Sequence, residues 1–394
     1  SKPRLLTGDT PTGKLHLGHW VGSVENRVRM QDDYDCYFLI ANKHAFTTRA
    51  DKPEDIRGSV LEIATDWLAC GIDPDRSTML IQSEVPAIDE LTFFFSMLIP
   101  FNRVMRNPTL AQEIRDKELG DVYPFGFPLY AVGQTADILA FRPAVVPVGE
   151  DQLPHLEMTR EVARRFNQLY CGVDPHTEDK DYLAAGGLLP VIEPVIGRVR
   201  RLVGIGAPDP QGRLLKMSKS LNNAIFLSDD ADTVKKKVMG MYTDPKRITG
   251  KEPGETDPSK NPLWAFHEAF NPDTAWVQEH RDLYAQGKVG DVPVKRKLID
   301  VINALLEPIR ERRKHYEQRP DDVLDARGTT AALGKTAGKD AAHGKRTYVS
   351  VYGLAEAENR ARAELNAALT AIVEFDGKAD ALRDLARFCV ERQS

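Results

Sequence analysis

Residues 11–19, Pro11-Thr-Gly-Lys-Leu-His-Leu-Gly-His19, carry the most informative pattern in this chain. It follows an apolar strand signal at Arg4-Leu-Leu-Thr7, passes through Gly13 and runs into a helical pattern that begins near Leu17. A strand, a glycine-bearing turn and a helix start together offer backbone N–H groups and a positive dipole end to a phosphate. The two histidines suit a nucleotide triphosphate. Gly18 between them predicts an adenine ring so close to the backbone that a Cβ would block it.

A second motif, Lys216-Met-Ser-Lys-Ser220, lies far downstream, after a region that alternates strand and helix signals. Either motif alone has a simpler explanation, as a structural helix start or as a solvated surface turn. The two motifs in this order are much harder to obtain by chance. With both, the sequence resembles the class I aminoacyl-tRNA synthetases.

The length and composition limit the kinds of protein that this chain can be. The chain has 394 residues, 42% of them hydrophobic and 28% charged, and a net charge of −5. This length predicts two or three domains, and the charge argues against coating by nucleic acid. Because the sequence has neither a run of about 20 apolar residues nor a signal-peptide pattern, we expect a cytoplasmic protein without a membrane partner. The cysteines lack metal-type spacing, which predicts a reducing compartment and no zinc: Cys36, Cys70, Cys171 and Cys389.

The first part of the chain predicts an α/β fold. Residues 34–41 form a near-continuous apolar run, residues 53–71 have helical spacing, and residues 77–82 are predicted to form a further strand. Such alternation predicts a doubly wound parallel sheet, which resumes at residues 144–148. We therefore expect a Rossmann-like catalytic domain over residues 1–222. Within it, residues 84–123 are predicted to form a helical insertion whose apolar faces pack on a second subunit in a homodimer.

The rest of the chain is predicted to be mostly helical. Residues 153–170 form an amphipathic pattern, whereas residues 171–212 are rich in glycine and proline and have no evident purpose. Residues 223–319 are predicted to form a helical tRNA-binding domain. Its runs of lysine and arginine are either solvated helix faces or contacts to the tRNA backbone.

Within class I, residues 4–319 are similar to the tryptophanyl-tRNA synthetases. The resemblance rests on blocks that occur in the family's order: residues 8–13, 21–23, 134–138, 146–152, 159–160, 165–167 and 239–244. It implies a ligase that activates tryptophan with ATP, releases pyrophosphate and transfers tryptophan to tRNA(Trp). The tyrosyl-tRNA synthetases are the alternative, because they share the spacing of Tyr130, Gln134 and Asp137. The blocks at 146–152 and 239–244 favour tryptophan.

The resemblance also implies an amino-acid pocket. A carboxylate at Asp137 can accept the indole N–H, and a buried acceptor without its donor costs about 1–3 kcal/mol, so phenylalanine would be rejected. The alternative is that Asp137 is the N-cap of the apolar segment 138–141. By the same resemblance Tyr130, Gln134 and His44 would line the pocket, and Gln152 would meet the amino group or the ribose.

The nucleotide site is implied in the same way. His16, His19, Lys216 and Lys219 are the expected catalytic residues. The other expected ATP contacts are Thr10, Thr12, Gly18, Gly149, Glu150, Asp151, Met217, Ser218 and Ser220. Magnesium would neutralise the triphosphate and keep mostly water ligands, so no metal cage of protein side chains is expected. Thr10 and Asn42 depart from the residues that are usual in the family.

The end of the chain does not fit this family. Residues 320–394 resemble the C-terminal part of a trans-isoprenyl diphosphate synthase, and Asp321, Asp322 and Asp325 match its second aspartate-rich motif. A matching first motif is missing from the sequence, so we expect no prenyl transfer. The replaced tail raises another alternative, a synthetase-like binding or regulatory protein that does not charge tRNA.

Overall fold

The computed structural model describes residues 2–117, 119–199, 201–219, 221–318 and 323. The chain divides into two compact units, residues 1–332 and 333–394, and the described residues belong to the first. The expected ATP contact Ser220 and the aspartates Asp321, Asp322 and Asp325 lie outside the described residues.

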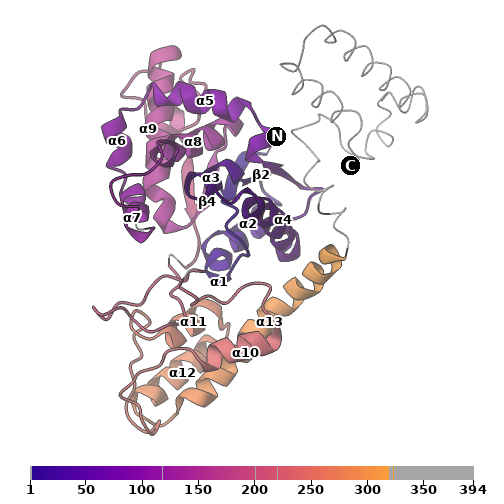
Figure 1. The fold of residues 1–394 in the computed structure, drawn as a ribbon, viewed down its shortest axis with the longest axis vertical. Helices are drawn as coiled ribbons and strands as arrows, with labels where there is room; N and C mark the ends of the chain where they lie inside the picture. The colour runs from indigo at the N-terminus through magenta and orange to yellow at the C-terminus, as the bar shows by residue number, and fades with distance from the viewer. Residues whose placement is uncertain (1, 118, 200, 220, 319–322, 324–394) are drawn as a thin grey trace, which may run out of the picture. The chain divides into compact units, whose positions relative to one another are not determined.

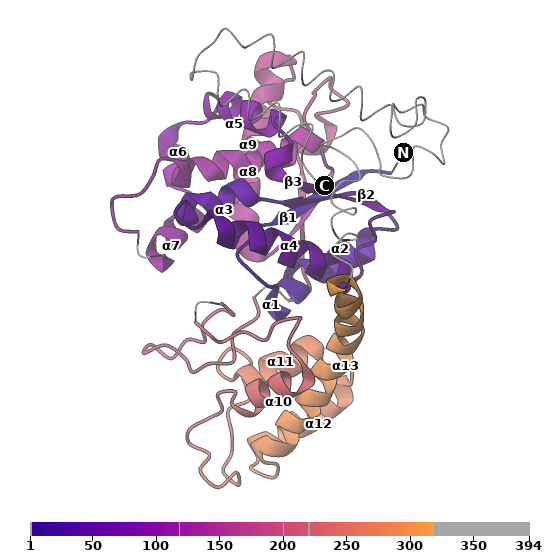
Figure 2. The same ribbon diagram turned by 45° about the vertical axis from the view of Figure 1, so that its right-hand side comes forward.

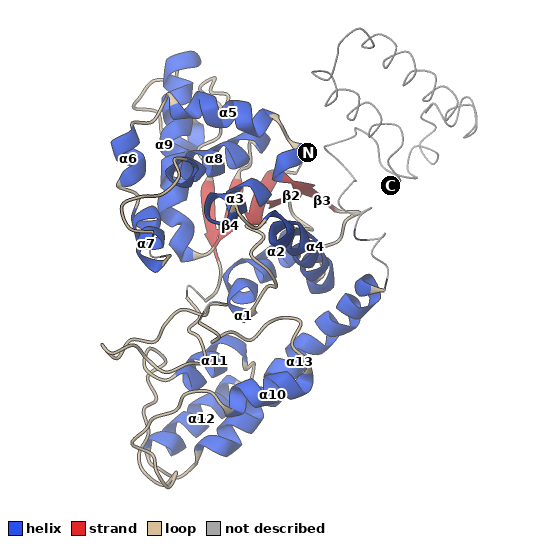
Figure 3. Cartoon of the chain, in the orientation of Figure 1, coloured by secondary structure: helices blue, strands red, loops and turns tan. Residues whose placement is uncertain are grey.

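A five-stranded parallel sheet organises the first unit, which confirms the doubly wound fold (Figure 3). Its strands are β1 (Arg4–Asp9), β2 (Asp35–Ile40), β3 (Ser77–Ile81), β4 (Val145–Val148) and β5 (Glu193–Ile196). Their order is β3-β2-β1-β4-β5. After β1, the chain adds β2 and β3 on one side of that strand, and it then adds β4 and β5 on the other side. In such a sheet, ligands bind beyond the carboxyl ends of the strands where the order reverses, here beyond β1 and β4.

Successive side chains of each strand point to opposite faces of the sheet and pack in two different hydrophobic clusters. Phe38 and Ile40 of β2 lie in the cluster that contains Ile63 and Trp67 of α4 (Pro53–Cys70). Leu39 lies in the other cluster, with α5 (Ala87–Ser96), α8 (Gly126–Phe141) and α9 (Leu153–Tyr170). Helices on both faces explain why the strands are apolar throughout rather than alternating.

The region between β3 and β4 is helical, as predicted for residues 84–123. It contains α5, α6 (Phe101–Met105) and α7 (Pro108–Asp116) before α8 begins. Aromatic contacts pack α5 on α9, with the Phe95 and Phe166 rings 6.4 Å apart between their centroids. The insertion thus forms one layer with the helix that follows β4.

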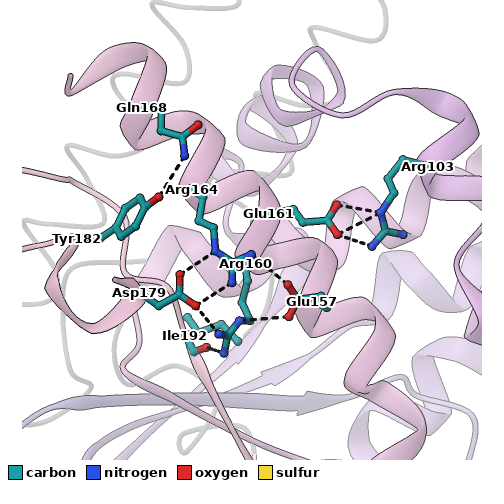
Figure 4. Close-up of polar contacts among 9 residues, drawn as sticks. All are labelled: Arg103, Glu157, Arg160, Glu161, Arg164, Gln168, Asp179, Tyr182 and Ile192. Atoms are coloured by element: carbon teal, nitrogen blue, oxygen red, sulfur yellow. Dashed lines mark hydrogen bonds and ion pairs between the residues drawn. The ribbon is translucent and has the colours of Figure 1, made fainter. Parts of the chain in front are cut away.

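The segment after α9, for which the sequence suggested no purpose, delivers the edge strand β5. Asp179 accepts hydrogen bonds from Arg160 at 2.5 Å and from Arg164 Nε at 2.7 Å (Figure 4). The buried Asn167 side chain donates to the Leu189 carbonyl at 2.7 Å. These contacts hold the segment along α9 until it reaches the sheet.

The last described helices form a second group, α10 (Ala231–Met239), α11 (Pro262–Phe270), α12 (Thr274–Ala285) and α13 (Asp291–Glu317) (Figures 1 and 2). α13 also packs on α4. Arg312 Nε donates to the Ala69 carbonyl at 2.6 Å, and Arg313 pairs with Asp66. In its contacts, α13 therefore belongs with the synthetase-like part of the chain as far as Glu317.

Candidate active site

The first motif forms the loop after β1 and a short helix, α1 (Leu17–His19). Its two histidine rings lie 3.8 Å apart between centroids, and the His16 backbone N–H donates to His19 Nδ1 at 3.1 Å. Burial, and next the mutual repulsion with His19, lower the pKa of His16 to about 2. Burial lowers that of His19 to about 4. Both rings are therefore neutral at pH 7 and can donate one N–H each without carrying charge.

Gly18 is required by the histidine pair itself. A Cβ at this position would lie 2.9 Å from His16 Cε1 and 3.7 Å from the Cβ of Met217. The first contact is too close for a real side chain, so any other residue would displace the His16 ring. The sequence assigned Gly18 to the approach of adenine, and the structure adds a reason within the protein.

The chain that follows the second motif pairs with the first. The Leu17 N–H donates to the Ile225 carbonyl at 2.9 Å, and the Leu227 N–H donates to the Leu15 carbonyl at 3.0 Å. On its other side, the Leu15 N–H donates to Asp66 Oδ2 on α4 at 2.7 Å. The fold thus brings the two motifs together, as the sequence analysis expected.

The two lysines of the second motif reach different loops. Lys219 Nζ donates to the Gly13 carbonyl at 2.8 Å and to Thr12 Oγ1 at 3.2 Å. Lys216 Nζ pairs with Asp151 Oδ2 at 2.9 Å. Burial lowers the pKa of Lys219 to about 8, and adding an anionic ligand would raise it again. Met217 between them is buried, and its N–H donates to the Leu202 carbonyl.

The loop after β4 connects this group to the residues expected to form the amino-acid pocket. Glu150, Asp151 and Gln152 form a 3₁₀ turn, η3 (Glu150–Gln152). A Cβ at Gly149 would lie 2.7 Å from Asp151 Oδ1, so a larger residue there would displace the Asp151 carboxylate. Gln134 Nε2 donates to Gln152 Oε1 at 3.2 Å, and Gln152 Nε2 donates to Asp151 Oδ2 at 3.4 Å. One line of polar side chains therefore runs from Gln134 to Lys216.

Asp137 lies inside α8, so its alternative assignment as a helix N-cap is wrong. Its carboxylate is buried and accepts both its short hydrogen bonds from Gln82 Nε2, at 2.8 and 3.0 Å. His44 Nε2 lies 3.5 Å from Asp137 Oδ2, as expected for two residues of one pocket. Gln82 follows β3, and the sequence analysis missed it; its position directly after an apolar strand was the available signal.

Burial raises the pKa of Asp137 to about 7, although the Gln82 hydrogen bond opposes this shift. The ionised carboxylate is the better acceptor for an N–H group. We therefore expect the affinity for tryptophan to fall about tenfold when the pH is lowered from about 8 to about 6, because protonation competes with binding. Tryptophan titrations without ATP measure this effect, since they avoid the titration of Lys219. Asp137→Asn should flatten the profile, and an unchanged slope in that variant would contradict the assignment.

Three further residues named in the sequence analysis, Tyr130, Thr10 and Asn42, lie near the ends of the strands or on α8. Tyr130 packs against His44 with ring centroids 5.7 Å apart, and its hydroxyl meets His155, which the sequence analysis missed. Thr10 is exposed at the end of β1. Asn42 exchanges two hydrogen bonds with Ser83, at 2.8 and 3.0 Å. This departure from the family therefore ties the loop after β2 to the loop after β3.

The donors in the first group fit a polyphosphate. His16 Nδ1 is buried and has no hydrogen-bond partner among the described residues, and two lysine ammonium groups lie in the same group of loops. A buried ring nitrogen without a partner and converging cations suit an anion with many acceptor oxygens. In the described ranges, no three histidine, cysteine, aspartate or glutamate side chains are grouped to hold a metal ion. No helix in those ranges is long and apolar enough to cross a membrane.

Comparison with known proteins places these features in a family. The family model for class I tRNA synthetases of the W and Y type matches residues 1–307. The polyprenyl synthetase model matches residues 309–384, which confirms the resemblance of the tail. This match begins within α13, before the boundary expected near residue 320.

The similar proteins of known sequence or structure named here are all tryptophan–tRNA ligases. The chain is 44% identical over 325 residues to the tryptophan–tRNA ligase of Clostridium longisporum, covering 82% of this chain and 89% of that protein. It is 40% identical over 370 residues to that of Chlamydia caviae, covering 93% and 99%. The tryptophanyl-tRNA synthetase of Campylobacter jejuni, solved with ADP and tryptophan, superposes with a TM-score of 0.64 at 26% identity, covering 82% of this chain and 92% of that one. The chain belongs to the class I tRNA synthetases of the tryptophan and tyrosine type, and within them to the tryptophan–tRNA ligases.

Proposed function

We propose that this chain activates tryptophan with ATP between the two groups of side chains described above. The observation that carries this proposal is the polar line from Gln134 through Gln152 and Asp151 to Lys216. It links the Asp137 pocket to the two motifs, so an amino acid and a nucleotide bound there would meet at its middle. Asp137 would accept the indole N–H, and Gln152 would meet the amino group or the ribose.

The first step needs no nucleophile from the protein. A carboxylate oxygen of tryptophan forms a bond to the α-phosphorus of ATP, and the bond from that phosphorus to the bridging oxygen breaks, releasing pyrophosphate. The contribution of the chain is position and charge. Neutral His16 and His19 would donate to the phosphates, with Thr12 in support. Lys216 and Lys219 would hold the leaving pyrophosphate.

The adenosine part would lie against the backbone of the two motifs. Gly18 and Met217 would frame adenine, while Gly149 and Asp151 would meet the ribose. Thr10, Glu150, Ser218 and Ser220 complete the proposed set of ATP contacts. Magnesium bound to the triphosphate would neutralise part of its charge and keep mostly water ligands.

The second step transfers tryptophan to tRNA(Trp). The 2′-hydroxyl of the terminal ribose would attack the carbonyl of the adenylate, and AMP would leave. We propose residues 1–222 as the catalytic domain, residues 223–319 as the tRNA-binding domain and the cytoplasm as the location. Incubating the intact chain with tRNA(Trp), ATP and labelled tryptophan tests this step. Charged tRNA is expected. Adenylate formation without charging would favour the alternative of a binding or regulatory protein with a replaced tail.

We also propose that the chain is a homodimer. Large apolar side chains on the insertion are exposed, namely Phe93 at 69%, Met97 at 63% and Phe101 at 57%. Leu169 and Tyr170 at the end of α9 are exposed as well. Residues next to some of them in the chain line a groove of about 410 Å³: Leu98, Ile99, Pro100, Glu161, Val162, Arg164, Arg165 and Gln168. Figure 4 draws three of these residues, Glu161, Arg164 and Gln168. Apolar side chains gathered around a groove are typical of a protein interface.

Met97→Glu should convert the dimer to monomer. Two carboxylates brought into a self-complementary interface raise the dissociation constant about 100-fold or more, because each loses water beside apolar groups. Sedimentation velocity measures the change. Ile248→Glu is the matched control, since Ile248 is 87% exposed and lies outside the insertion. A Met97→Glu chain that stays dimeric would place the interface elsewhere.

A further inference from the structure

Three buried or half-buried side chains form a line that the proposed chemistry does not use. Tyr130 on α8 lies with its hydroxyl 3.2 Å from His155 Nε2 on α9. The other ring nitrogen, His155 Nδ1, lies 3.1 Å from Asn107 Nδ2, at the N-cap of α7. His155 and Asn107 are fully buried, at 1% and 0% exposure. The line therefore connects the amino-acid pocket to the helical insertion.

The orientation of the Asn107 side-chain amide determines which atoms donate and which accept in these hydrogen bonds. Its Oδ1 accepts the Thr109 backbone N–H at 3.0 Å, and a backbone N–H can only donate. The other amide atom, which faces His155 Nδ1, is therefore the NH₂ group. A donor at that place makes Nδ1 an acceptor and puts the ring hydrogen on Nε2. Burial lowers the pKa of His155 to about 4, so the ring carries one hydrogen at pH 7.

It follows that His155 Nε2–H donates to the Tyr130 oxygen. Tyr130 must then direct its own hydrogen elsewhere, and its oxygen keeps one lone pair for a further donor. Burial and the nearby Glu113 carboxylate raise the pKa of Tyr130, so the hydroxyl stays neutral. The Tyr130 side chain is fixed as an acceptor before any ligand arrives.

Tryptophan has two groups that can donate to such acceptors, the indole N–H and the α-ammonium. Asp137 lies on the same helix as Tyr130, seven residues or roughly 10 Å further along its axis. If Asp137 takes the indole N–H, the ammonium is left for the other end of the pocket. Gln134 lies between the two residues on α8.

We propose that His155 is a positioning residue that presents the Tyr130 oxygen to the α-ammonium of the amino-acid substrate. This rests on the proposed function, because it deepens the assignment of the same pocket. Asn107 acts one step further back by fixing the ring hydrogen on Nε2. His155 itself touches no substrate atom.

Calorimetric titration of the full chain with tryptophan, without ATP, tests the proposal. His155→Phe should weaken tryptophan binding about tenfold, the effect of one misplaced hydrogen bond to a charged group. Indole-3-propionate lacks the ammonium, and its affinity should not change. His155→Gln offers an amide N–H in place of Nε2–H and should restore most of the loss.

A second comparison separates positioning from packing. In a Tyr130→Phe background, His155→Phe should cause no further loss of tryptophan affinity, because the hydroxyl through which it acts is gone. Additive losses, or equal losses for tryptophan and indole-3-propionate, would overturn the proposal. If His155→Phe fails to fold, His155→Gln and Tyr130→Phe give the same comparison, and a Gln variant as weak as Tyr130→Phe overturns it. A wild-type chain that binds no tryptophan would overturn the proposed function as well.

Discussion

Replacing Asp137 by alanine should lower the kcat/KM for tryptophan-dependent ATP–pyrophosphate exchange about 10³-fold. The variant loses the acceptor for the indole N–H and leaves that N–H buried without a partner in the complex. A lost hydrogen bond to a charged group and a stranded donor together amount to about 4 kcal/mol. The KM for ATP should not change, because the polar contacts of Asp137 among the described residues are with Gln82 and His44, outside the two motifs.

Asp137→Asn is the matched control. It keeps one oxygen acceptor of the same size, so exchange should fall about tenfold rather than a thousandfold. Thermal unfolding of both variants should resemble the wild type, since a buried carboxyl with a raised pKa contributes little stability at neutral pH. Exchange within a factor of three of wild type in Asp137→Ala would remove Asp137 from the pocket.

Arg313→Met should lower the free energy of unfolding by about 3–5 kcal/mol. Arg313 on α13 pairs with the fully buried Asp66 and with Glu62, the latter at 2.8 Å. Without Arg313, the Asp66 carboxylate is left charged and unpaired inside the protein. Its other oxygen holds the Leu15 N–H of the first motif. Urea unfolding followed by tryptophan fluorescence measures the loss.

The double variant Asp66→Asn with Arg313→Met separates the charge from the contact. Asparagine still accepts the Leu15 N–H, and the uncompensated charge is gone, so most of the lost stability should return. The single variant should also regain stability as the pH falls. Burial already raises the pKa of Asp66 to about 6 in the presence of Arg313. The folded variant binds that proton more tightly than the unfolded chain does, so stability increases below the folded-state pKa. A single variant as stable as the double one would contradict this account.

The sequence predicted the elements whose signals are local. The strand at 77–82, the helix at 53–71 and the helix at 153–170 agree with β3, α4 and α9 within a residue or two. Each has a continuous apolar run or a clear helical period, and Gly71 ends α4 in the left-handed conformation that glycine favours.

Other elements could not be found in that way. α8 is covered on both sides and is apolar nearly all round, so it shows no helical period, and Asp137 could be mistaken for a helix start. β5 contains Pro194, which an edge strand tolerates but which weakens a strand pattern. Its place in the sheet depends on the contacts of Asp179 and Asn167, which the sequence does not display.

The same distinction, between local sequence signals and contacts with distant elements, applies to the site residues. Motif residues such as His16 and Lys216 could be proposed from the sequence because their types and order are diagnostic. Gln82, Asn107 and His155 were not proposed from the sequence, since each is singled out only by its contact with a partner on another element. Such roles become visible when the fold has placed the partners together.

Amino-acid-dependent ATP–pyrophosphate exchange by the intact chain shows whether it activates tryptophan and whether Asp137 selects it. The assay compares tryptophan, tyrosine and phenylalanine, each with the wild type and with Asp137→Ala. We expect exchange with tryptophan alone, and loss of that exchange in the variant. Exchange with tyrosine instead would support the tyrosyl alternative, and no exchange with any of the three would contradict the assignment of an activating enzyme.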